Sequence, residues 1–117
     1  MYSVNYRTSR SVKYPMIIHT PEVPKSFARH PKVMEALYAI VEDFNFEEQQ
    51  AIYYHHHTKL SPQTIANVLE LTEPHVISAL TLYAERLASR IDLFKRTLPH
   101  DADDTMQPGD ILLAWTA

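Results

Sequence analysis

The sequence predicts an all-α protein, a small helical bundle with a helix-turn-helix and a long C-terminal helix, preceded by an extended N-terminal arm. Three observations indicate this fold class. Glycine occurs once and apolar residues make up 45% of 117 residues, which favours packed helices over a turn-rich β fold. Apolar residues recur at helical spacing from Pro31 onward. Finally, a capping residue is followed closely by proline twice in succession, at Ser61 and at Thr72.

Residues 1–30 are predicted to form an extended basic arm. Pro15, Pro21 and Pro24 lie too close together for a long helix, although the alternation of Tyr2 with Val4 is compatible with a short strand. Up to residue 34 the only acid is Glu22, and the cations are Arg7, Arg10, Lys13, Lys25, Arg29 and Lys32. This charge suits contact with phosphate, a tether to a second subunit, or a solvated tail.

Residues 31–98 are predicted to be the helical domain. Its first helix begins at Pro31 and ends at about Asp43 because apolar residues follow a helical period and proline fits the first turn. Asn45 followed three residues later by Glu48 is a capping-box pattern, so a second helix should run from residue 46 to about residue 56.

The third and fourth predicted helices form the helix-turn-helix at residues 61–82. Ser61 caps the third, and Thr72 caps the fourth, which continues to about Thr97. Ala66 should lie where the two helices cross most closely, because a larger side chain would push them apart. The predicted shared core is Ile65, Leu69, Leu71, Val76 and Leu80.

Residues 99–117 are predicted to be an acidic linker and an apolar C-terminal tail. Pro99 ends the long helix, and residues 100–110 resemble a mobile linker. The final ILLAWTA is apolar enough to dock on the bundle as a strand or an anchor. Phosphate would repel this segment, which has no Lys or Arg and contains Asp101, Asp103, Asp104 and Asp110.

Composition narrows the functional classes. The absence of cysteine excludes thiolate catalysis and zinc sites built on sulfur, and no run approaches the roughly 20 apolar residues of a membrane span. No catalytic triad pattern or phosphate-binding glycine loop is visible, so we expect a soluble cytoplasmic protein that is not an enzyme and has no cofactor.

Two groups of residues could form a functional site, but a structural role is the simpler interpretation of each. The side chains of His55, His56 and His57 would point about 100° apart on a helix, so no metal is expected there and we predict a polar helix end. Tyr53 and Tyr54 could stack on nucleic-acid bases, but we expect their rings to pack against the protein while their hydroxyl groups contact solvent. The same expectation applies to Tyr83.

Residues 44–90 resemble the C-terminal helix-turn-helix domain of bacterial sigma factors, which reads the upstream promoter element. The likeness is carried by FNFEEQQAIYYHHHTKLSPQTIANVLELTEPHVISALTLYAERL, in which a leading helix precedes an Ile-Ala helix, a turn ending in Thr, and a Val-led recognition helix. Sigma-like domains also occur in phage regulators. The chain differs from the family pattern in two ways. Glycine is usual at the position of Glu70, and a residue other than glycine there requires backbone adjustment or strain. The recognition helix also lacks arginine and lysine.

The resemblance implies a DNA-binding transcription regulator, expected to be a homodimer on double-stranded DNA. Base edges and nearby groups would be contacted by Thr72, His75, Ile77, Ser78 and Thr81. Phosphates would be held by Lys59, Arg86, Arg90 and, in the arm, Arg7, Arg10 and Lys13. The alternative is a sigma-like adaptor that binds RNA polymerase or another regulator without reading bases. A third hypothesis is an oligomerisation module built on the long helix and apolar tail.

Overall fold

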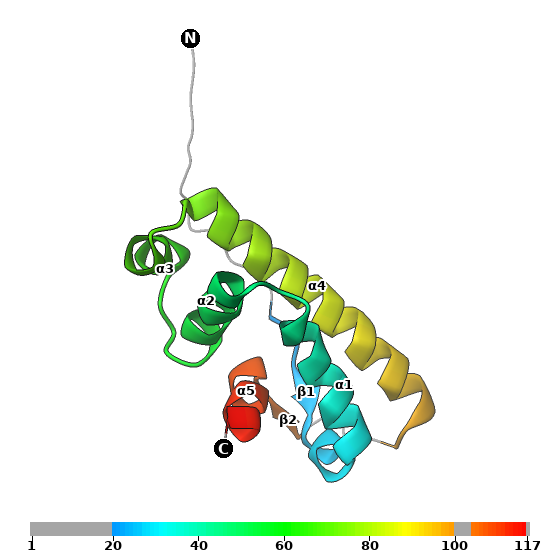
Figure 1. The fold of residues 1–117 in the computed structure, drawn as a ribbon. Coiled ribbons are helices and arrows are strands. Elements are labelled where there is room, and N and C mark those ends of the chain that lie inside the picture. The colour runs from blue at the N-terminus through cyan, green and yellow to red at the C-terminus, as the bar shows by residue number, and fades with distance from the viewer. Residues whose placement is uncertain (1–19, 100–103, 117) are drawn as a thin grey trace.

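A computed structural model describes residues 20–99 and 104–116 of the chain, with side chains up to Leu112. It confirms the all-α class, because the strands have only two residues each. Among the described helices, none is both long enough and apolar enough to cross a bilayer. The elements in chain order are β1 (Val23–Pro24), the 3-10 helix η1 (Lys25–Arg29), α1 (Pro31–Glu42), α2 (Phe46–His56), α3 (Pro62–Leu69), α4 (Glu73–Thr97), β2 (Thr105–Met106) and α5 (Pro108–Thr116) (Figure 1).

The four predicted helix starts are confirmed, and side-chain caps explain those of α2, α3 and α4. At α2 the Asn45 side chain accepts a hydrogen bond from the Glu48 backbone N–H at 2.8 Å, while Glu48 Oε1 accepts one from the Asn45 N–H at 3.1 Å. Ser61 Oγ accepts from Thr64 N–H at the start of α3. Each cap satisfies a backbone donor that the first helical turn leaves unpaired.

The turn between α3 and α4 runs from Glu70 to Thr72 and depends on a left-handed residue. Glu70 has φ 58° and ψ 41°, a conformation that side chains with a Cβ disfavour, as the sequence predicted. The backbone N–H groups of Glu70 and Leu71 both donate to the Ala66 carbonyl, which ends α3. This geometry turns the chain sharply enough for α4 to pack back on α3.

Helices α2, α3 and α4 pack on one another, and α4 extends beyond them to pack along α1 (Figure 1). Ala66 is 5% exposed, in agreement with the predicted close crossing. Of the predicted shared core, Leu69 and Leu71 are partly buried. The buried side chains of this three-helix unit include Ala51, Ile52, Ile65, Val76, Ala79, Leu80 and Tyr83.

The two ends of the described chain meet, which differs from the predicted mobile linker at residues 100–110. Strands β1 and β2 pair antiparallel, with Val23 opposite Met106, and the Lys25 backbone N–H donates to the Asp104 carbonyl at 2.9 Å. Phe27, in the region predicted to be an arm, is fully buried. These pairings depend on residues about eighty positions apart, and local sequence signals do not encode them. Residues 1–19 and 100–103 lie outside the described residues.

The apolar tail docks on the rest of the protein, as predicted, but as helix α5 and not as a strand. It packs on α1 and α2, where Ile111 and Leu112 are 2% and 4% exposed. Gly109 permits this contact, because a Cβ at that position would lie 2.5 Å from the His56 carbonyl oxygen. The close approach of two backbones there requires glycine for steric reasons, although its φ is not positive.

Candidate interaction surfaces

The outward surface of the helix-turn-helix is acidic and apolar. Residues 60–85, which include all of α3 and the first half of α4, contain no lysine and no arginine. Glu70, Glu73 and Glu85 are exposed on this segment. Two large apolar side chains are also exposed, Val68 at 55% and Leu82 at 40%. Such a surface offers phosphate no positive charge.

Two of the predicted recognition residues are engaged within the protein. Thr72 Oγ1 accepts a hydrogen bond from the His75 backbone N–H at 3.3 Å and so caps α4. The ring of His75 reaches back to α2, where its Nε2 lies 3.0 Å from Glu48 Oε2. In this structure both side chains therefore hold α4 in place.

The remaining predicted recognition residues differ in exposure. Ile77 and Thr81 are half-buried, and Ser78 is exposed on α4. Ser78 is thus the most accessible polar group of this set at the centre of the helix face. A single hydroxyl gives little discrimination between bases compared with a bidentate arginine or glutamine.

The described cations predicted to hold phosphates are widely separated. Lys59 is exposed between α2 and α3, in a left-handed conformation with φ 63°. Arg86 has its guanidinium carbon 5.5 Å from the centre of the Phe44 ring. At 1.5 Å per residue, Arg86 and Arg90 lie about 20 and 25 Å along α4 from Glu73. Arg90 lines a shallow depression between α1 and α4 with Lys32. The predicted arm residues Arg7, Arg10 and Lys13 lie outside the described residues.

The three consecutive histidines occupy three different environments. His55 Nδ1 donates to the Leu60 carbonyl at 3.1 Å in the turn before α3. His57 lies against Tyr53, with ring centres 4.9 Å apart. His56 is only 5% exposed, which corrects the prediction that all three form a polar helix end. The spacing of His56 four residues after buried Ile52 is the signal that could have indicated its inward direction.

His56 and Tyr83 form a buried polar pair between α2 and α4. Their ring centres are 5.3 Å apart, and among the described residues neither His56 Nε2 nor the Tyr83 hydroxyl has a hydrogen-bond partner. Burial is the main cause that lowers the pKa of His56 to about 4, with smaller effects of His55 and Lys59. Burial also raises the pKa of Tyr83. The hydroxyl of Tyr83 is therefore not solvated, contrary to the prediction.

A groove with a volume of about 300 Å³ lies between α1, α2 and α5. Four aromatic side chains line it, and most of them come from α2. Tyr53 and Tyr54 are half-buried in its wall, in agreement with the predicted packing role. Local periodicity did not indicate this groove, because α5 closes one side of it. The lining residues are Tyr38, Val41, Phe46, Gln49, Gln50, Tyr53, Tyr54 and Leu112.

Comparison with known proteins gave no significant match to a family model, a curated protein or a solved structure. The resemblance to a sigma-factor domain therefore rests on the sequence pattern alone.

Proposed function

We propose that the protein is a sigma-like adaptor in transcription, whose helix-turn-helix binds RNA polymerase or another regulatory protein instead of reading DNA bases. The observation that carries this proposal is the absence of lysine and arginine from residues 60–85. Helix α4 begins with exposed Glu73, and Glu70 precedes it in the turn. These carboxylates lie where a DNA-binding helix would meet phosphates.

DNA-binding proteins commonly neutralise about 6 to 10 phosphates, and their affinity falls steeply when cations are removed. In the described part of the helix-turn-helix region, Lys59 is the nearest cation to α3, and Arg86 lies about 20 Å from the start of α4. By contrast, exposed Val68 and Leu82 supply apolar area, which protein partners bury.

A charge-reversal pair tests the proposal. Binding of the full chain to purified bacterial RNA polymerase core enzyme is measured by biolayer interferometry. Glu73→Arg should weaken binding about tenfold if this helix end forms the interface. Glu35→Arg, an equally drastic change at an exposed site of α1, should leave it unchanged.

Site-specific photo-crosslinking in cells would identify a regulator other than polymerase. The photo-reactive residue is placed at position 68 of α3, which packs on α4. A defined protein of the transcription machinery crosslinked there supports the proposal. Crosslinks to DNA alone, together with no binding to core enzyme, would contradict it.

A DNA-binding regulator is the second candidate, supported by the arrangement of α3 and α4. The first turn of α4 lies beside α3 at one end of the bundle, the arrangement from which a recognition helix enters a major groove (Figure 1). Here Glu73→Arg has the opposite expected effect, because removing a carboxylate near phosphate strengthens binding. Titration of promoter fragments at about 50 and 200 mM salt measures both the affinity and its salt dependence. Light scattering over a range of concentrations tests the proposed homodimer.

A further inference from the structure

The groove between α1, α2 and α5 has an apolar floor and an aromatic rim. Val41 and Leu112 contribute buried aliphatic surface, and Tyr53 and Tyr54 stand edge to face with ring centres 6.1 Å apart. Tyr53 and Tyr54 are adjacent residues of α2, and their rings lie side by side in the wall of the groove. The groove is therefore built on rigid elements, without a contribution from the described loops.

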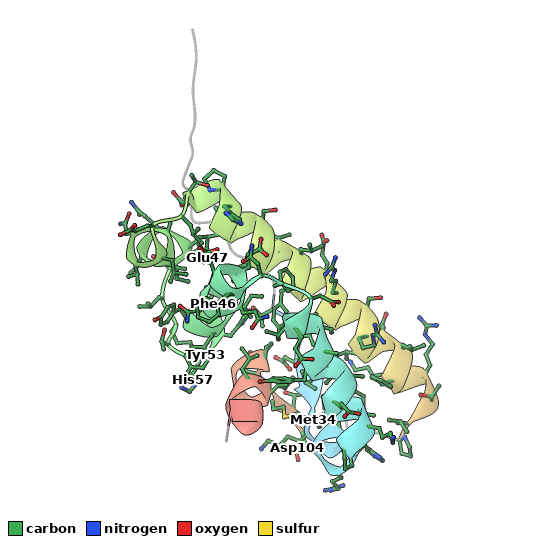
Figure 2. All side chains as sticks on the ribbon, in the orientation of Figure 1. Met34, Phe46, Glu47, Tyr53, His57 and Asp104 are labelled. Atoms are coloured by element: carbon green, nitrogen blue, oxygen red, sulfur yellow. The ribbon has the colours of Figure 1, made fainter. Side chains whose placement is uncertain are left out.

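Phe46 makes this surface unusual. It is 71% exposed, whereas Phe27 and Phe44 are 0% and 7% exposed and Phe94 is half-buried. Figure 2 shows Phe46 and Tyr53 along α2 above α5, with Glu47 next to Phe46. An exposed aromatic side chain at the edge of an apolar groove is the usual form of a binding hot spot, because a partner can bury the whole ring.

The charges around the groove are negative. No lysine or arginine lines it. Glu42 is exposed and lies one helical turn after the lining residue Tyr38 on α1. Burial and then the charge of Glu42 raise the pKa of Tyr38. Glu47 is exposed beside Phe46. The two carboxylates create a negative potential at a surface of aromatic rings, and both features attract a cation.

The polar groups of the lining favour a peptide. The side-chain amide of Gln49 donates to the Phe44 carbonyl at 2.8 Å, which fixes this glutamine against the end of α1. Gln50 is half-buried in the lining and carries one acceptor and two donors. A side-chain amide in an aromatic wall can both donate hydrogen bonds to a peptide backbone and accept them from it.

We infer that this groove binds a peptide segment of a partner protein that carries an arginine beside apolar residues. The guanidinium lies over the rings of Phe46 and the tyrosines and pairs with Glu47 or Glu42, while the apolar neighbours cover Val41 and Leu112. Arginine fits better than lysine because its planar group stacks on rings and pairs with carboxylates at the same time. This interaction goes beyond the proposed function, because it uses α1, α2 and α5 and leaves the outward surface of α3 and α4 uncovered.

Random dodecapeptides displayed on phage are the probe, selected on the immobilised full chain. The expected result is enrichment of sequences with arginine next to aliphatic or aromatic residues. A synthetic copy of the most enriched peptide, labelled with a dye, is then titrated by fluorescence anisotropy. Phe46→Ser and Glu47→Lys should each raise its Kd about tenfold, and the second effect should shrink at high salt.

Matched controls separate this groove from the rest of the surface. Val68→Ser and Leu82→Ser remove exposed apolar side chains from α3 and α4, and Glu35→Lys reverses an exposed charge on α1. These three variants should bind the peptide like the parent chain. Circular dichroism and urea unfolding verify that every variant is folded. Glu73→Arg should also leave peptide binding unchanged, so failure of the adaptor proposal is distinguishable from failure of this one.

Three results would overturn the inference. The first is enrichment of peptides without a cation. The second is peptide affinity that survives Phe46→Ser but is lost on Val68→Ser, which would move the site to the helix-turn-helix. The third is peptide binding that appears only after removal of residues 1–19, because the basic segment of the same chain would then be the occupant.

Discussion

His75 Nε2 lies 3.0 Å from Glu48 Oε2, and this contact joins the first turn of α4 to the first turn of α2. The same carboxylate closes the capping box of α2 through its other oxygen. The hydrogen bond from His75 is the main cause that lowers the pKa of Glu48, with a further contribution from the Asn45 capping contact. One side chain therefore sets both the start of a helix and its position against its neighbour.

Two substitutions of Glu48 should separate its role in the capping box from its contact with His75. Glu48→Ala loses the capping contact and the His75 contact, and should lower the free energy of unfolding by about 1 to 2 kcal/mol. Glu48→Gln keeps a capping acceptor and should lose less than the alanine variant. Urea unfolding at pH 7 measures both. Equal losses in the two variants would show that the cap contributes little.

Buried His56 should make stability depend on pH. Its folded-state pKa of about 4 lies below the ordinary value of 6.5, so the unfolded chain binds a proton first as the pH falls. The contribution of His56 is complete above pH 6.5 and is lost progressively down to pH 4, by at most about 3 kcal/mol. Urea unfolding at several values across this range should show the loss. In His56→Leu the slope between pH 6.5 and 4 should flatten, and an unchanged slope would assign it to other groups.

A methyl group at position 109 should displace α5. The Cβ of Gly109→Ala would meet the His56 carbonyl oxygen at 2.5 Å and its carbon at 3.1 Å, and both are backbone atoms that cannot rotate away. We expect a loss of about 1 to 3 kcal/mol and faster amide hydrogen exchange in α5. Gln107→Ala, at an exposed neighbouring position, is the control and should behave like the parent chain. Unchanged exchange in Gly109→Ala would mean that α5 moves without loss of packing.

The turn between α3 and α4 should become more stable with glycine. Glu70 is held at φ 58°, so Glu70→Gly relieves the steric conflict of its Cβ and should raise the free energy of unfolding by about 1 kcal/mol. Glu70→Ala keeps the Cβ and should give no such gain. Comparison of the two by urea unfolding isolates the backbone effect, and equal stability would argue against strain at this position.

The sequence predicted the helices well because their signals are local. Asn45, Ser61 and Thr72 each accept a backbone hydrogen bond at the helix start that they were predicted to cap. The strain at Glu70 was indicated by the resemblance, because the sigma-factor pattern usually has glycine at this position. These features involve residues within a few positions of one another, so a single sequence contains the information.

Tertiary features escaped prediction for the opposite reason. The Glu48–His75 contact joins residues 27 positions apart, and the pairing of β1 with β2 joins the two ends of the described chain. The aromatic groove needs Leu112 of α5 as well as α2. Nothing in the local pattern of the ILLAWTA segment indicates which surface it will cover, because that choice depends on the shape left by helices elsewhere.

The antiparallel pairing of Val23 with Met106 has a consequence for synthesis. During translation, the N-terminal half of the chain emerges from the ribosomal exit tunnel well before β2 and α5 do. During that interval the partner surfaces of β1 and of the α1–α2 side are uncovered, even when α2, α3 and α4 have already packed. Strand β2 and helix α5 are translated after the other described elements and thus complete the folded unit. A nascent chain stalled before residue 105 would expose apolar surface to chaperones.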